Sequence, residues 1–191
     1  KLGYDITFIN TCFENRKMSY YEHCRYRNFE GVVIVCANFD DPDVIELMNS
    51  EIPVVTIDYV HHNCTAVTSN NIQGMEDLVK YIYSQGHRKI AYIHGQEGSS
   101  VTRDRLASFY RTIDELGLEI PDTYVRSADY LETKGSAKQT KELLNLEDPP
   151  TCIIYPDDTS LIGGRNVIIE MGLRIPRDIS VAVYDLSLIH I

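Results

Sequence analysis

Side chains able to bind a small molecule stand directly after apolar runs in this sequence. Asp157 and Asp158 follow "CIIYP", Asp185 follows "VAVY", Tyr130 follows "VRSAD", and Arg105 comes shortly after "IAYIHG". Ligands of open parallel sheets bind beyond the carboxyl ends of the strands, so these side chains are candidates for one site. Carboxylates and arginine hold hydroxyl groups, and an aromatic ring packs on a ring face. The mixture suits a polyhydroxylated or heterocyclic small molecule.

Other chemistry has less support in the sequence. The three aspartates could form a metal or phosphoryl-transfer site, but the Lys and Ser/Thr partners of such a site are not evident. "HGQEGSS" lacks the Lys-Ser/Thr ending of a phosphate-binding loop, and no G-x-G-x-x-G or G-x-S-x-G motif follows a strand. "HHNC" at 61–64 has no second ligand pair at zinc spacing. We therefore expect a binding domain with no metal and no cofactor, and not an enzyme.

Composition and charge narrow the class of protein further. The 191 residues carry a net charge of −10, so this segment by itself should bind nucleic acid poorly. No run of about 20 apolar residues and no apolar leader is visible. The five cysteines never form CxxC, and Cys12, Cys36 and Cys152 lie in or beside apolar runs. This pattern predicts reduced, buried thiols in a cytoplasmic protein.

Short apolar runs alternate with amphipathic segments along the whole chain, which is typical of βαβ units. The pattern predicts an α/β fold with mostly parallel sheets in two lobes, residues 1–86 and 87–185, divided near 86–89. The expected strands are 6–10, 31–37, 52–58, 65–70, 89–95, 123–129, 151–157 and 179–185. The expected helices are 14–28, 40–51, 72–87, 99–117, 132–146 and 158–172.

Several of these segments together resemble one protein family. "GHRKIAYIHG", the helix start "RLASF", the strand end "PDD" and "GLRIPRDISVAVYD" are similar to the effector-binding core of LacI/GalR-type bacterial transcription regulators. The resemblance covers residues 1–185 and implies two Rossmann-like lobes of the periplasmic-binding-protein-like type I, here incomplete at both ends. It also implies an effector, most often a sugar, between the lobes. A helix-turn-helix headpiece absent from this chain would bind operator DNA as part of a homodimer.

The same resemblance suggests roles for individual residues. Arg105 would bind effector hydroxyls or carboxylates, although a surface ion pair with Asp104 or Glu97 is the alternative. Tyr130 would stack on the ligand ring, or else be a core or hinge tyrosine. Asp157 stands where the family has Asn and would accept ligand hydroxyls. Asp158 would be the N-cap of the next helix, and Asp185 would bind polar groups of the ligand.

Two positions depart from the family pattern. An Asp-Asn pair of the family reads Ser69-Asn70 here, so the first lobe loses a charge from its half of the site. Asn71 could compensate, or it could be a helix cap. Val183 replaces a glycine, which changes the local shape of the cleft.

The last six residues, "LSLIHI" at 186–191, do not match the family. They correspond to a translated sequencing adapter, so we expect a non-native tail, and an apolar last strand is the alternative. The function expected is the ligand-sensing core of a repressor-type regulator. A periplasmic-type sugar-binding transport receptor of the same fold is the alternative. A chain incomplete at both ends is expected to be poorly stable or to aggregate.

Overall fold

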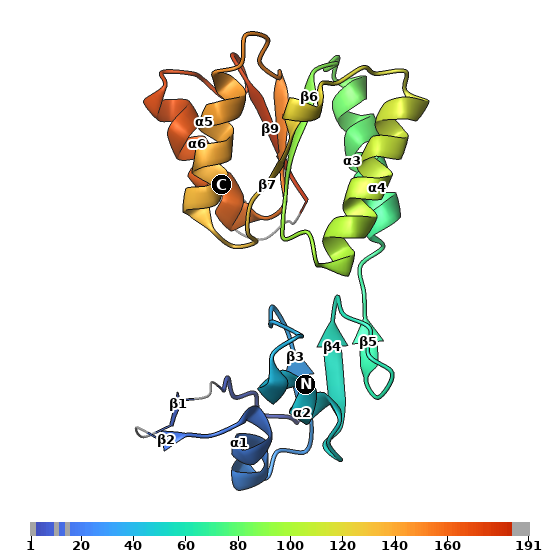
Figure 1. Ribbon diagram of the computed structural model, residues 1–191, viewed down its shortest axis with the longest axis vertical. Helices are drawn as coiled ribbons and strands as arrows, with labels where there is room; N and C mark the ends of the chain where they lie inside the picture. The colour runs from blue at the N-terminus through green and yellow to red at the C-terminus, as the bar shows by residue number, and fades with distance from the viewer. Residues whose placement is uncertain (1–2, 10–11, 14–15, 185–191) are drawn as a thin grey trace. The chain divides into compact units, whose positions relative to one another are not determined.

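The computed structural model describes residues 3–9, 12–13 and 16–184, and the side chains only of those outside 12–17. The chain forms two compact units, residues 1–69 and 70–191 (Figure 1). Both units alternate strands with helices, and their main sheets are parallel. The predicted α/β fold with mostly parallel sheets is confirmed.

The first unit has a three-stranded parallel sheet in the order β3-β4-β5 and a short antiparallel pair, β1 and β2. Its core lies between α1, α2 and one face of the sheet, where Cys24, Leu47 and Met48 pack against Ile34 and Val54. The elements are β1 (Cys12–Phe13), β2 (Arg16–Lys17), α1 (Tyr20–Arg27), β3 (Val32–Ile34), α2 (Pro42–Met48), β4 (Val54–Ile57) and β5 (Thr65–Val67).

Helix α1 begins later than residue 14, the start that the polar pattern predicted. Its N-cap is Ser19, whose side chain accepts from the backbone N–H of Glu22, while the Glu22 carboxylate accepts from the Ser19 backbone. This reciprocal capping box fixes the start of a helix. Arg16–Lys17 instead pairs with Cys12–Phe13.

The strand predicted at 6–10 is wrong for the residues that the structure describes. Residues 6–9 have no strand conformation, and residue 10 lies outside the described part of the chain. Ile6 and Phe8 are almost fully exposed. An apolar run forms a strand only where a neighbouring strand takes up its hydrogen bonds, and none of the described strands pairs with this one.

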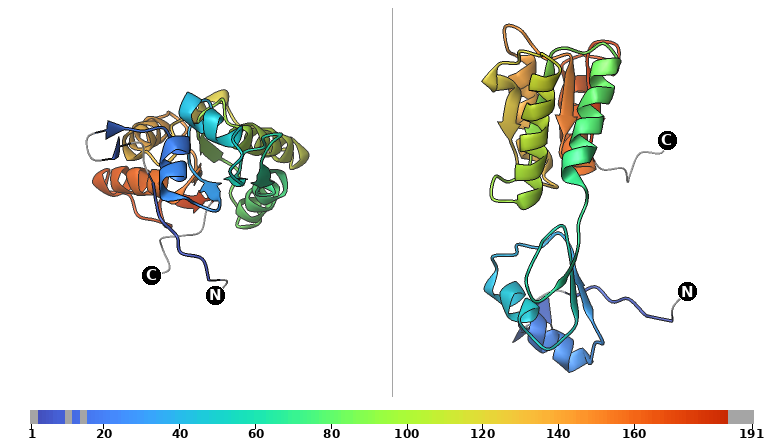
Figure 2. Two further views of the ribbon diagram at one scale, coloured as in Figure 1. Left: turned by 90° about the horizontal axis from the view of Figure 1, so that it is seen from below. Right: turned by 90° about the vertical axis from the view of Figure 1, so that its right-hand side faces the viewer.

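The second unit has a four-stranded sheet in the order β7-β6-β8-β9, with every neighbouring pair parallel. Helices α3 and α4 cover one face and α5 and α6 cover the other (Figures 1 and 2). The elements are α3 (Asn71–Ser84), β6 (Ile90–His94), α4 (Ser100–Glu115), η1 (Asp122–Tyr124), β7 (Val125–Ser127), α5 (Thr133–Leu144), β8 (Cys152–Tyr155), α6 (Asp158–Glu170) and β9 (Ser180–Val183).

Helix α3 belongs to the second unit, so the division of the chain lies between Ser69 and Asn70 and not near 86–89 as predicted. The reason is the apolar stripe of α3. Met75, Val79 and Ile82 share one core cluster with Ile90 of β6 and Phe109 of α4. Burying this stripe against the second sheet stabilises the helix there, because an amphipathic helix packs where its apolar face is covered.

Candidate functional site

Arg105 is the best-anchored of the predicted ligand residues. It lies on the second turn of α4 and is only 4% exposed. Its Nε donates to Asn71 Oδ1 at 2.9 Å, and its Nη1 donates to the Pro156 carbonyl at 3.2 Å. These bonds connect α4 with the start of α3 and the end of β8. The surface ion pair considered for Arg105 does not describe this buried position.

Tyr184 covers the guanidinium of Arg105. The centre of its ring lies 3.5 Å from the Arg105 Cζ, a cation–π contact. Tyr184 follows the last residue of β9, and its backbone N–H donates to the Tyr155 carbonyl at 3.2 Å. Its hydroxyl lies where a Cβ on Gly74 would stand, because that Cβ would be 2.3 Å away. Tyr184 is not among the ligand residues predicted from the sequence, although its neighbour Asp185 is.

Tyr130 stands beside the end of β6. Its hydroxyl shares a 2.8 Å hydrogen bond with Thr102 Oγ1, one turn before Arg105 on α4. The ring packs directly on Gly95, where an added Cβ would lie 2.1 Å from the nearest ring atom. Tyr130 is half-buried. Its predicted stacking on a ligand ring stays a prediction.

Asp157, and not Asp158, is the N-cap of α6. Its Oδ1 accepts from the Ser160 backbone N–H at 2.9 Å, and its Oδ2 accepts from Ser160 Oγ and from the Leu131 N–H, both at 3.0 Å. The Asp158 prediction is therefore wrong by one residue. The buried Asp157 carboxylate joins the end of β8 to the segment that follows β7, and its predicted contact with a ligand is untested.

The pair Ser69-Asn70 spans the division between the two units. Asn70 is the N-cap of α3 and accepts from the Gln73 N–H at 3.3 Å. The backbone N–H of Ser69 donates to Asp58 Oδ1 at 2.8 Å, within the first unit. Asn71 is buried and bonded to Arg105, so of the two alternatives considered for Asn71 the structure excludes the cap.

Within the second unit, the contacts of Arg105, Tyr130 and Asp157 join neighbouring segments at the carboxyl ends of β6, β7 and β8. Asn70 adjoins them through its carbonyl, which accepts from the Tyr184 hydroxyl at 3.5 Å. Ser69 belongs to the other unit. Asp185 and the tail 186–191 lie outside the described residues.

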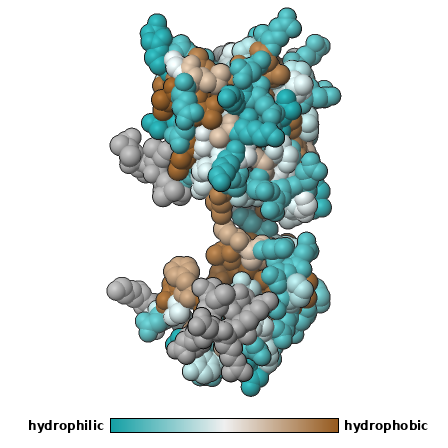
Figure 3. Space-filling view, turned by 60° about the vertical axis from the view of Figure 1, so that its left-hand side comes forward, coloured by the Kyte–Doolittle hydropathy of each residue, from teal (hydrophilic) through white to brown (hydrophobic). Residues whose placement is uncertain are grey.

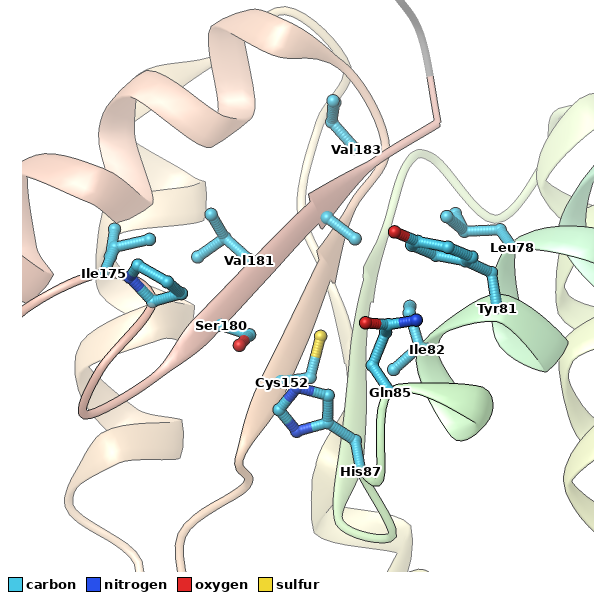
Figure 4. Close-up of a pocket in the computed structure, with 12 residues that line it drawn as sticks. Leu78, Tyr81, Ile82, Gln85, His87, Cys152, Ile175, Ser180, Val181 and Val183 are labelled. Carbon is cyan, nitrogen blue, oxygen red and sulfur yellow. The ribbon is translucent and has the colours of Figure 1, made fainter.

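A cavity of about 550 Å³ opens elsewhere on the second unit (Figure 4). One wall is β9 with the preceding Ile175 and Pro176, and the other is the outer part of α3 with Leu78, Tyr81 and Gln85. Its lining includes Cys152 and Ser180, the first residues of β8 and β9. The cavity therefore reaches the amino ends of these strands, and we do not assign the ligand site to it.

The described cysteines are all free thiols, but not all are buried as predicted. Cys24 and Cys152 are buried, whereas Cys36, two residues beyond the end of β3, is exposed. The side chain of Cys12 is outside the described part. His61 and Cys64 approach within 3.8 Å, and among the described residues no group of three or more His, Cys, Asp or Glu could hold a metal ion.

Comparisons with known proteins all point to one family. Residues 79–189 match the model of the periplasmic binding protein-like domain. The HTH-type transcriptional repressor PurR of Aliivibrio salmonicida is 26% identical over 189 residues, which are 97% of this chain and 56% of that protein. The chain thus spans about half the length of the curated relatives it matches.

Solved structures agree with this result. A regulatory protein of the LacI family from Chloroflexus aggregans is 28% identical with a TM-score of 0.69, over 85% of this chain and 59% of that one. A LacI transcriptional regulator from Rhodococcus species has a TM-score of 0.72 at 23% identity, over 83% and 59% of the two chains, and this likeness concerns the fold alone. No helix among the described residues is long and apolar enough to cross a membrane. The chain belongs to the periplasmic binding protein-like domain family, in the form found in LacI/GalR-type regulators.

Proposed function

We propose that this chain is the ligand-sensing core of a bacterial transcription regulator of the repressor type. It binds a small effector, a sugar, and the effector changes the affinity of a DNA-binding headpiece for an operator. The full protein acts in the cytoplasm as a homodimer and is not an enzyme. The observation that carries the proposal is the position of Arg105. This residue of α4 is bonded to the first residue of α3 and to the residue after β8, in a domain whose named relatives are repressors.

The site chemistry suits a sugar. Arg105 supplies a guanidinium held in place by Asn71 and Pro156, and the half-buried Tyr130 supplies an aromatic face. Arginine recognises hydroxyls and carboxylates through its planar fork, and aromatic rings pack on the C–H face of a sugar. The net charge of −10 agrees with DNA contacts made by a separate part of the protein. A transport receptor is not favoured, because the relatives described above are transcription regulators.

The test is a ligand panel on the purified chain. Thermal shift and calorimetric titration would be run with glucose, galactose, ribose, glucuronate, galacturonate, adenine and hypoxanthine. Arg105→Lys keeps the charge but loses the fork, so we expect it to weaken the binding of any hit by about tenfold or more.

Arg103→Lys is the matched control, because Arg103 lies two residues away on the same helix and is exposed. It should leave affinity unchanged. Binding by none of the panel compounds, or equal losses for the two arginine variants, would contradict the proposal.

A further inference from the structure

Tyr92 carries a buried hydroxyl that lacks a hydrogen-bond partner. It is the third residue of β6, is fully buried, and its ring packs on Phe109 at 5.3 Å between ring centres. Its hydroxyl oxygen is a buried polar atom with no partner among the described residues. Tyr124 and Tyr155 are equally buried, and their hydroxyls bond to the Asp148 carbonyl at 2.8 Å and to Thr140 Oγ1 at 2.9 Å. An unpaired buried hydroxyl is rare and costs about 1–3 kcal/mol.

Tyr92 lies next to the candidate site. Tyr92 and Tyr184 pack in the same core cluster, on the sheet face covered by α3 and α4. Burial is the main reason that the pKa of Tyr92 is raised, and Tyr130, Arg105 and Tyr184 all influence it electrostatically. Tyr92 pairs with Ile154 of β8 and Ile154 with Ala182 of β9, so Tyr184 lies two residues further along the same face of the sheet. Phe109, on which Tyr92 packs, lies one turn after Arg105 on α4, so Tyr92 occupies the layer next to Arg105 and Tyr184.

Tyr184 covers one side of this region. It is half-buried, whereas the Arg105 guanidinium beneath its ring is nearly inaccessible. The hydrogen bond from its hydroxyl to the Asn70 carbonyl is 3.5 Å long, at the weak end of the range. A rotation of this side chain would expose the side of the Arg105 guanidinium that the ring covers, while the backbone stays bonded to Tyr155.

The Arg105 guanidinium and the Tyr92 hydroxyl would both favour a hydrogen-bond acceptor on the ligand. The Arg105 guanidinium only donates, and the Tyr92 hydroxyl is a donor without an acceptor. Hydrogen bonds made in such a dry site are stronger than in water. The chemistry that fits is an oxygen atom of the ligand, supplied by a carboxylate or by a sugar hydroxyl.

We infer that Tyr92 and Arg105 form a polar socket beneath Tyr184, and that a ligand oxygen enters it when the Tyr184 ring turns away. This inference rests on the proposed function, because the socket belongs to the same ligand site. It gives Tyr92 a role that the family resemblance does not assign. The partner of its hydroxyl arrives with the ligand.

The experiment compares Tyr92→Phe with Tyr155→Phe in the full 191-residue chain. Both substitutions remove one buried hydroxyl and little else. Without ligand, Tyr92→Phe should melt at the wild-type temperature or higher, whereas Tyr155→Phe should melt lower because it loses the bond to Thr140. With any panel compound that binds the wild type, Tyr92→Phe should raise the dissociation constant about fivefold or more, and Tyr155→Phe should leave it unchanged.

The two sources of the oxygen are separated by comparing galactose with galacturonate and glucose with glucuronate. A loss confined to the uronates assigns the socket to a carboxylate, and an equal loss for both assigns it to a hydroxyl. A Tyr92→Phe melting temperature reduced as much as that of Tyr155→Phe would overturn the inference, since the hydroxyl would already be bonded. So would a ligand that binds wild type and Tyr92→Phe equally well, and that outcome would leave the proposed function intact.

Discussion

Asp157 accepts hydrogen bonds from two neighbouring segments, and this decides what its substitution would do. It caps α6 through Ser160 and holds the N–H of Leu131, a residue with a positive φ of 57°. A non-glycine residue in this conformation persists only where its surroundings hold it. The carboxylate is therefore a structural support for the segment that carries Tyr130.

We expect Asp157→Ala to lower the free energy of unfolding by about 2–3 kcal/mol, the sum of a lost N-cap and an unsatisfied N–H. Denaturant unfolding measures it. Asp157→Asn separates the N-cap from the bond to Leu131. Its amide oxygen can still accept from Ser160, but its amide NH₂ group presents a donor to Leu131 or to the ligand. If Asp157→Ala unfolds like the wild type and loses only ligand affinity, Asp157 is a ligand residue and not a support.

The thiols differ in their expected reactivity. Burial raises the pKa of Cys152 to about 12, whereas Cys36 is exposed. Because the thiolate is the reactive form, Cys36 should be alkylated rapidly at neutral pH and Cys152 only after unfolding. Mass spectrometry of peptides labelled with iodoacetamide measures both rates. Fast labelling of Cys152 in the folded chain would show that the second unit opens readily.

At the scale of elements, local signals in the sequence predict most boundaries. Asp41 caps α2 with Pro42 at its first position, and Gly86, Gly117 and Gly172 have positive φ just beyond α3, α4 and α6. The predictions of a strand at 6–10 and of an early start of α1 are wrong, and they concern segments without an amphipathic stripe or a partner strand. Their conformation depends on contacts that pattern alone does not specify.

The site is predictable in its residue types more than in its contacts. The motif resemblance predicted Arg105 and Tyr130 as ligand residues. It did not predict that Asn71 bonds to Arg105 or that Tyr184 covers Arg105. Both contacts depend on how α3 packs beside α4 and on where β9 ends. The assignment of α3 to the first lobe hid this relation, since Asn71 was then expected in the other half of the molecule.

The contact between α5 and α6 gives a prediction about packing. Gly163 of α6 lies against the backbone of Thr133, so that an added Cβ would stand 2.2 Å from the Thr133 carbonyl oxygen. Backbone cannot move aside as a flexible side chain can. We expect Gly163→Ala to lower the free energy of unfolding by about 1–3 kcal/mol, measured by thermal or urea melts.

Gly98 is the matched control, because an added Cβ there meets no atom within 4 Å. Gly98→Ala should melt close to the wild type. Equal melting temperatures for the two variants would mean that α5 and α6 separate enough to admit the methyl group.

At the scale of the whole molecule, the two units differ in how their sheets are covered. Every residue of β6 in the second unit is buried, because helices pack on both faces. In the first unit, Val33, Val55, Ile57 and Val67 form an open face, opposite the face that α1 and α2 cover. Val33 is 62% exposed and Val67 is 55% exposed. Figure 3 shows hydrophobic side chains, in brown, at the surface of this unit, which is the lower one in that view.

Parallel sheets are normally buried on both faces, and contiguous exposed apolar surface promotes association. We therefore expect the isolated chain to self-associate with rising concentration, as measured by size-exclusion chromatography with light scattering. The double variant Val33→Thr, Val67→Thr should reduce this association. Each of its two substitutions should change the free energy of unfolding by less than about 0.5 kcal/mol, the usual range for surface positions.

Val54→Thr, on the covered face, should instead destabilise the unit, because it buries a hydroxyl in an apolar core. A chain that stays monomeric at all concentrations, with or without the threonines, would show that the open face does not drive association.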